Sequence, residues 1–339
     1  MSPERFLRIT GRYPSLHLAV VGDFCLDRYF DIDPTLQEVS IETGLPVHNV
    51  VGTRCQPGAA GTILNNLVAL GVGTLWPVGV AGEDGEGWEL LRALRRQPGV
   101  HADHFAQAAG RHTFTYSKPL LHHPGRPPEE LSRLDTKNWT TTPDAVSAEL
   151  VGHIDRLATR VDAMIVMDQV DRADTGVVTS PVRERVGRLA TERPEVPVVA
   201  DSRRSLRGFP PLVFKMNAAE LGLFAGHPVT TDAEIHAAAA DLARANGRPV
   251  FVTLAERGIV GAMPSGEVHH RPALPVRGPI DIVGAGDSVT ANLTAALAAG
   301  ATLPEAMELA MAAAHCVIHQ LGTTGTAGVA QLQAVLFPD

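Results

Sequence analysis

The chain has 339 residues, of which 45% are hydrophobic and 19% are charged, and this balance excludes a disordered or fibrous protein. Its 29 basic and 37 acidic side chains give a formal net charge of -8, which argues against nucleic acid or a membrane as a partner. The three cysteines form no CxxC pair, so a disulfide framework and a zinc knuckle are disfavoured and a reducing compartment is expected.

Up to residue 254, short apolar runs alternate with helical patterns. Buried strands are predicted over residues 17–22, 74–80, 163–167, 196–200, 212–216 and 249–254. Helices are predicted between them, over residues 61–70, 87–96, 144–159, 177–191, 218–224 and 232–245. The alternation predicts a single α/β domain over residues 1–339, with a mostly parallel central sheet and helices on both faces.

Two segments depart from this pattern, residues 29–53 and residues 111–136. Apolar and polar residues alternate in both, and no helix follows closely. We predict that they are extended strands that leave the main sheet and form a small lid; the alternative is a pair of long irregular loops. Exposed strand edges favour pairing between subunits, so a homodimer through the lid is expected.

The last third of the chain is predicted to be helical. One helix spans about residues 286–299, and a second starts at a capping box of Thr302 and Glu305 and runs to about residue 321. No run approaches the ~18 apolar residues needed to span a bilayer, and the N-terminal residues lack the apolar core of a secretion signal. A cytoplasmic location is therefore expected.

The most informative stretch is DIVGAGDS, residues 281–288, where an irregular segment becomes a helix. Two glycines at a helix start let unpaired backbone N–H groups converge on one point, where the helix dipole favours negative charge. An aspartate beside such an anion hole suits a general base that takes a proton from an acceptor hydroxyl. The alternative interpretation is that Asp287 only caps the helix.

Five further motifs accompany GAGD in order along the chain. They are Gly22-Asp23 with Asp27, the glycine-rich residues 58–61, residues 78–85, Asn217 with Glu220, and residues 252–258. Together with GAGD they resemble the ribokinase-like (PfkB) carbohydrate kinases, over nearly the whole chain from about Leu18 to Gly328. The resemblance implies a ribokinase-like fold and transfer of the γ-phosphoryl group of ATP to a hydroxyl of a sugar or sugar phosphate.

The resemblance also implies roles for individual residues. Asp287 is the implied base, and the backbone of Gly284, Ala285 and Gly286 is the implied anion hole. The residues implied to contact the sugar are Asp23, Asp27, Gly58, Ala59 and Thr62. The residues implied to organise ATP and Mg2+ are Asn217, Glu220, Thr253, Gly258 and Arg203, with Glu220 acting on magnesium indirectly. A monovalent cation such as K+ is implied near Asp281.

Within the family, the chain most resembles the heptose-phosphate kinase module of bifunctional ADP-heptose synthases. This rests on residues 20–23 and 26–29, residues 132–135 and residues 321–323. If the acceptor is a phosphorylated sugar, the cations expected to hold its phosphate are Arg133, Arg203 and Lys118. Thr62, Ala59 and Ala255 replace residues usual in the family. They leave two alternatives open: a kinase for an unphosphorylated sugar or a nucleoside, and a sugar- or nucleotide-binding sensor with weak catalysis.

Other designs are excluded or disfavoured. The chain has no Gly-Lys dipeptide and hence no P-loop, and it lacks both the protein-kinase motifs and a Rossmann fingerprint after the first strand. His315 and His319 have metal-ligand spacing, but no acidic third ligand sits at a matching spacing, so packing is favoured. His269 and His270 are predicted to lie in a loop.

Overall fold

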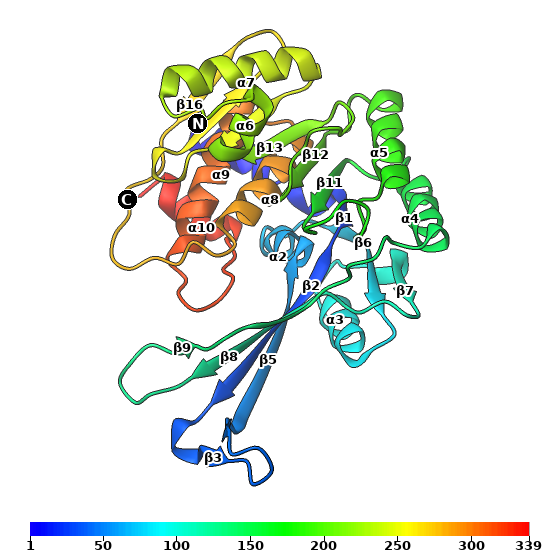
Figure 1. The fold of residues 1–339 in the computed structure, drawn as a ribbon. Helices are drawn as coiled ribbons and strands as arrows, with labels where there is room; N and C mark the ends of the chain where they lie inside the picture. The colour runs from blue at the N-terminus through cyan, green and yellow to red at the C-terminus, as the bar shows by residue number, and fades with distance from the viewer. Residues whose placement is uncertain (339) are drawn as a thin grey trace.

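The computed structural model describes residues 1–338 and contains a nine-stranded central sheet (Figure 1). Its order is β16-β15-β14-β13-β12-β11-β1-β6-β7, and only β15 and β16 run antiparallel to their neighbours. The strands are β1 (His17–Gly22), β6 (Thr74–Gly82), β7 (Phe105–Ala108), β11 (Ala163–Asp168), β12 (Val198–Ser202), β13 (Val213–Asn217), β14 (Val250–Thr253), β15 (Ile259–Ala262) and β16 (Val268–Arg271).

Helices cover both faces of this sheet, because neighbouring residues of a strand point to opposite sides. In β1, Leu18 and Val20 belong to one buried apolar cluster, whereas Ala19 and Val21 belong to the other. The first cluster is completed by α1 (Pro3–Thr10), α2 (Ala60–Ala69), α3 (Gly85–Arg95), α8 (Ala285–Ala298), α9 (Leu303–Ile318) and α10 (Val329–Leu336). The second cluster is completed by α4 (Asp144–Leu157), α5 (Ser180–Glu192), α6 (Ala218–Ala225) and α7 (Asp232–Asn246).

A second, smaller sheet extends away from this body as the lid (Figure 1). Its order is β10-β8-β2-β5, with β9 paired to β8 and a separate β3–β4 hairpin. The strands are β2 (Phe24–Ile32), β3 (Glu38–Val39), β4 (Pro46–Val47), β5 (Val50–Ala59), β8 (Thr115–Leu121), β9 (Glu129–Glu130) and β10 (Leu134–Thr136). Short 3₁₀ helices are η1 (Tyr13–Ser15), η2 (Pro34–Leu36), η3 (Ala102–His104) and η4 (Ala255–Arg257).

The structure confirms the predicted α/β class and each predicted strand and helix, with shifted ends. The lid sheet begins at Phe24 rather than 29 and continues to Ala59 rather than 53, because β2 follows β1 after one residue and β5 runs directly into α2. Helix α9 has the predicted capping box but ends at Ile318, not 321. The loop prediction for His269 and His270 is wrong, since both lie on the antiparallel edge strand β16. Within residues 1–338, the membrane-span criteria of length and apolar character are met by none of the helices.

Candidate functional site

The N-terminus of α8 has the geometry expected of an anion hole. Gly284 precedes the helix with a φ of 82°, and a Cβ at this position would lie 2.6 Å from Cγ2 of Thr324. Glycine therefore meets both the backbone and the space requirement. The Ala285 N–H donates to the Ile282 carbonyl at 3.2 Å, so its share of the anion hole stays a prediction. The amides of Gly286 and Asp287 follow in a first turn that has no intrahelical acceptors.

Asp287 lies in this first turn with only 8% of its surface exposed. Burial raises the pKa of its carboxyl to about 6. The positive charges of Arg203 and Lys215 oppose this rise, and the negative charges of Asp201 and Asp27 add to it. Among the described residues, no ion pair or side-chain hydrogen bond engages this carboxyl, which is therefore available to a ligand. A base with a pKa close to neutrality is well matched to taking a proton from a hydroxyl.

Asp27 occupies the lid side of the same space. Its carboxylate is 3.0 Å from Nζ of Lys118, and a Cβ on Gly58 would lie 2.5 Å from Oδ2 of Asp27. Gly58 is therefore needed to leave room for this carboxylate. Burial raises the pKa of Asp287, and the negative charge of Asp27 adds to this rise.

The lid face that carries Asp27 is rich in cations. The parallel register pairs Asp27 with Tyr116, so both side chains leave the same face of the sheet. Tyr29 carries Lys118 and Arg54 against its ring, at 4.8 and 4.9 Å from the ring centroid. Arg133 lies over Tyr116 at 4.5 Å and is paired at 2.8 Å with Asp135, a strand neighbour of Tyr116.

The start of α2 closes the site between the lid and α8. Ala59 precedes this helix with a φ of 54°. A Cβ on Gly284 would lie 3.4 Å from Cγ2 of the buried Thr62, so the first turn of α2 lies beside the anion hole. Gln56, on β5 of the lid, donates to Oγ1 of Thr324 at 2.8 Å and so connects the lid to the loop that contacts Gly284.

Asn217 and Glu220 form a capping box at the start of α6. The Asn217 side chain accepts the Glu220 N–H at 2.9 Å, and Oε2 of Glu220 accepts the Asn217 N–H at 2.7 Å. Burial raises the pKa of Glu220. Oε1 of Glu220 has no protein donor within residues 1–338, and carboxylate oxygens of this kind suit Mg2+. The two residues therefore fit the predicted magnesium role while also capping a helix.

Residues 252–258, which we call the nucleotide turn because they include the predicted ATP-organising residues Thr253 and Gly258, lie next to this capping box. The register pairs Thr253 with Asn217, and the Thr253 hydroxyl donates to the Met216 carbonyl at 3.3 Å. Gly258 has a φ of 97°, and a Cβ there would meet the Arg271 carbonyl at 2.0 Å. Ala255 adopts a φ of 52° in the same turn. Thr253 and Gly258 are thus brought to the end of the sheet that carries Asn217.

Arg203 follows β12 and is exposed, with Nε donating to Gln169 at 3.2 Å. Burial raises the pKa values of Asp287 and Glu220, and the positive charge of Arg203 opposes both rises.

Two of the predicted acidic site residues, Asp23 and Asp281, accept hydrogen bonds from the backbone of nearby loops. The Asp23 carboxylate accepts the N–H groups of Gln169 and Val177 at 2.8 and 2.7 Å, and burial and then Asp168 raise its pKa to about 7. This geometry favours an anchoring role for Asp23, and its sugar contact stays a prediction. Asp281 accepts the N–H groups of Val283 and Gly322 at 3.0 and 3.3 Å, so it joins the GAGD loop to the C-terminal turn. Its cation role also stays a prediction.

The sequence interpretation missed Lys215 and Asp201. Nζ of the buried Lys215, on β13, lies 2.8 Å from Oδ2 of the buried Asp201, on β12. Both charges influence the pKa of Asp287. A signal was present, because the chain has only three lysines and this one interrupts a buried apolar strand.

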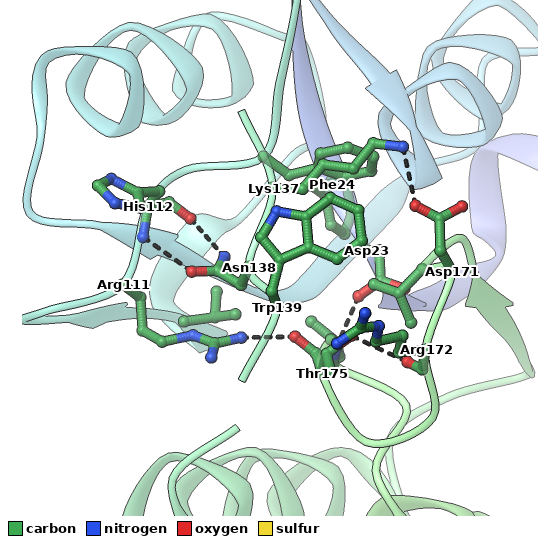
Figure 2. Close-up of a pocket in the computed structure, with 15 residues that line it drawn as sticks. Asp23, Phe24, Arg111, His112, Lys137, Asn138, Trp139, Asp171, Arg172 and Thr175 are labelled. Carbon is green, nitrogen blue, oxygen red and sulfur yellow. Dashed lines mark hydrogen bonds and ion pairs between the residues drawn. The ribbon is translucent and has the colours of Figure 1, made fainter. Parts of the chain in front are cut away.

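A cavity lies where the lid joins the body, next to Asp23 (Figure 2). It is bounded by the two chain segments that connect the lid to the body and by the loop after β11. Lys137 points to Asp171 at 2.9 Å, and Asn138 exchanges two hydrogen bonds with the backbone of His112. Of the predicted site residues only Asp23 lines it, so this cavity belongs to the base of the lid and is separate from the predicted chemistry at α8.

No group of three or more potential metal-ligating side chains occurs in the part of the chain that the structure describes.

Comparison with known proteins identifies the class to which this fold and site belong. The model of the pfkB family carbohydrate kinases matches residues 17–328, so the chain belongs to this family. Among solved structures, ribokinase of Arabidopsis thaliana, complexed with ribose and ATP, has a TM-score of 0.70 at 20% identity and covers 96% of this chain and 99% of its own. Phosphofructokinase-2 of Escherichia coli, in complex with fructose-6-phosphate, has a TM-score of 0.68 at 16% identity and covers 94% and 97%. These neighbours confirm the ribokinase-like fold.

More specific relatives are the proteins described as bifunctional protein HldE. That of Azorhizobium caulinodans is 32% identical over 310 residues, which is 90% of this chain and 61% of the relative. That of Gluconacetobacter diazotrophicus is 31% identical over 96% of this chain and 64% of the relative. The chain thus spans a little under two thirds of the length of these relatives.

Proposed function

We propose that the protein transfers the γ-phosphoryl group of ATP to a hydroxyl of a sugar phosphate. The observation that carries this proposal is the buried Asp287 carboxyl in the first turn of α8, which forms no ion pair or side-chain hydrogen bond within residues 1–338. The acceptor hydroxyl gives its proton to Asp287 while its oxygen bonds to the γ-phosphorus. The bond from that phosphorus to the β–γ bridging oxygen breaks, and ADP leaves.

The chain's own groups supply orientation and charge. Asp27 accepts hydrogen bonds from acceptor hydroxyls, and Gly58 keeps the space beside its carboxylate open. The Gly286 and Asp287 amides, with the dipole of α8, stabilise negative charge on the phosphoryl group. Arg203 adds a positive charge on the same side. Mg2+, held near Glu220 and Asn217, would neutralise phosphate charge.

The cations of the lid support a phosphorylated acceptor. Arg54, Lys118 and Arg133 surround the two tyrosine rings on the face that carries Asp27. Arginine and lysine donors of this kind bind phosphate oxygens. The resemblance to heptose-phosphate kinase modules and the similarity to HldE proteins favour a heptose phosphate within this class.

One observation favours a second candidate, an uncharged sugar. Lys118 and Arg133 already have carboxylate partners, Asp27 and Asp135, which would compete with a substrate phosphate. A coupled ADP-release screen over sugar phosphates, free sugars and nucleosides separates the two. Faster ADP release with sugar phosphates alone supports the first proposal, and faster release with free sugars alone supports the second.

The substitution Asp287→Asn tests the base. Loss of an oriented general base typically costs about 10²- to 10⁴-fold in rate, so kcat should fall by that factor while ATP and acceptor still bind. Calorimetry measures the binding, and the screen above measures turnover. Wild-type kcat in this variant would rule out Asp287 as the base.

The pH dependence of turnover follows from the same carboxyl. Asp287 accepts a proton only when ionised, and its pKa is raised to about 6. We therefore expect kcat/KM to be constant near pH 8 and to fall tenfold per pH unit well below pH 6. Steady-state kinetics from pH 4.5 to 9 checks this, and a rate that stays level down to pH 4.5 would contradict it.

A further inference from the structure

A buried cluster of three residues places a positive charge next to the first turn of α8. Nζ of Lys215, on β13, and Oγ1 of Thr290, on α8, both donate to Oδ2 of Asp201, on β12, at 2.8 and 3.0 Å. Lys215 and Asp201 are 6% and 5% exposed, and Thr290 is fully buried. The cluster therefore fixes the ammonium group of Lys215 relative to α8 through two neighbouring strands of the central sheet.

The ammonium group lies against the proposed anion hole. A Cβ built on Gly286 would be 3.3 Å from Nζ of Lys215, so the glycine of GAGD leaves the space that this side chain occupies. The ion pair with Asp201 at 2.8 Å thus holds the ammonium group beside the backbone that precedes Asp287.

The charged groups that act on Asp287 come from the strands β12 and β13, from the residue after β12 and from the lid. Arg203, which follows β12, and Lys215 stabilise its ionised form, whereas Asp201 on β12 and Asp27 on the lid oppose ionisation. Lys215 is the buried member of the two cations, so solvent screens its charge least.

We propose that Lys215, held in place by Asp201 and Thr290, is a positioning residue that keeps Asp287 ionised and the first turn of α8 ready to receive a phosphoryl group. This inference rests on the proposed function and adds a residue that belongs neither to GAGD nor to the Asn217–Glu220 pair. Lys215 acts through Asp287 and the α8 amides.

The test uses the acid limb of the pH–rate profile for the whole chain. Lys215→Met removes the cation, so the limb should move to higher pH by about one unit, the lower end of the effect of a charge at close range. Asp201→Asn removes a neighbouring negative charge but keeps an amide oxygen that accepts from Lys215, so the limb should move to lower pH while Lys215 stays in place. Opposite displacements by the two substitutions support a positioning role.

The control is Thr294→Val, one turn further along α8, where a buried hydroxyl donates to the Thr290 carbonyl and does not reach Asp201. It should leave the limb in place. Thermal melts establish that each variant is folded, and if Lys215→Met does not fold, Asp201→Asn still tests the direction of the displacement. A limb that stays at its wild-type position in the folded variants would overturn the inference. An active Asp287→Asn variant would instead overturn the proposed base.

Discussion

Two alanines of the candidate site have backbone conformations that usually require glycine. Ala59 has φ 54° and ψ -117°, and Ala255 has a φ of 52°. A Cβ in this region approaches the backbone too closely, which costs about 1–3 kcal/mol. The sequence had singled out both positions because glycine is usual there, and the structure supplies the physical reason. Strain of this kind persists only where the surrounding fold enforces it, here beside the anion hole and in the nucleotide turn.

Ala59→Gly should therefore stabilise the protein. Glycine adopts this conformation without a clash, and the expected gain in the free energy of unfolding is about 1 kcal/mol after the entropic cost of glycine. The matched control is Ala60→Gly at the first residue of α2, which should destabilise by about 0.5–1 kcal/mol. Urea unfolding measures both. Equal destabilisation by the two substitutions would contradict the strain at Ala59.

At the scale of elements, two histidines that are 49 residues apart in the sequence join η3 to α4. Nδ1 of His104 lies 3.0 Å from Nδ1 of His153, and Arg156 donates to that same His153 atom at 2.6 Å. Because arginine only donates, Nδ1 of His153 carries no proton and accepts from both neighbours. Burial, and then nearby positive charges, lower the pKa values of both histidines.

This pair predicts a loss of stability in acid. A histidine whose pKa is lowered in the folded state stabilises the fold above its unfolded pKa of about 6.5, and this contribution is lost as pH falls through that value. Near the pair, Arg160 and Arg156 oppose protonation, whereas Asp103 and Glu149 favour it. The melting temperature should fall between pH 7.5 and pH 5.5 by more in the wild type than in a His104→Gln/His153→Gln variant. Parallel curves for the two proteins would exclude the pair as the cause.

At the scale of the whole molecule, the lid presents apolar side chains to solvent at its far end. Val39 and Ile41 are 65% and 103% exposed, and Leu45, Val50 and Val51 are exposed on the same hairpin and edge strand. Exposed apolar residues gathered beside an unpaired strand edge favour association. The expected homodimer through the lid remains a prediction, and this surface supports it.

The oligomeric state tests that surface directly. We expect a dimer in light scattering at about 50 µM protein, and Ile41→Asp should convert it to a monomer because a carboxylate is costly to bury. Leu223→Asp, at an exposed position on α6, is the matched control and should leave the dimer intact. A wild-type monomer under these conditions would exclude the lid dimer.

Some features could be read from local pattern alone. Six strands of the central sheet are short apolar runs that were predicted correctly, as was the capping box of α9, whose residues lie three positions apart. The short strands β7 and β15 were not predicted. The edge strand β16 was missed because its four half-buried residues, which include His269 and His270, carry no apolar signal. The GAGD stretch indicated the anion hole because glycines at a helix start have few other uses.

The order of elements, the α/β class and the position of Asp287 were determined by the sequence, because periodicity and helix-start signals act over a few neighbouring residues. Which side chains meet was decided by the tertiary structure. Strand register and helix packing bring Lys215 to Asp201 and Lys118 to Asp27, and they turn Asp23 toward the loop after β11. A sequence pattern indicates that a charged residue will be buried, but its partner lies on another element, and only the folded chain fixes the distance between them.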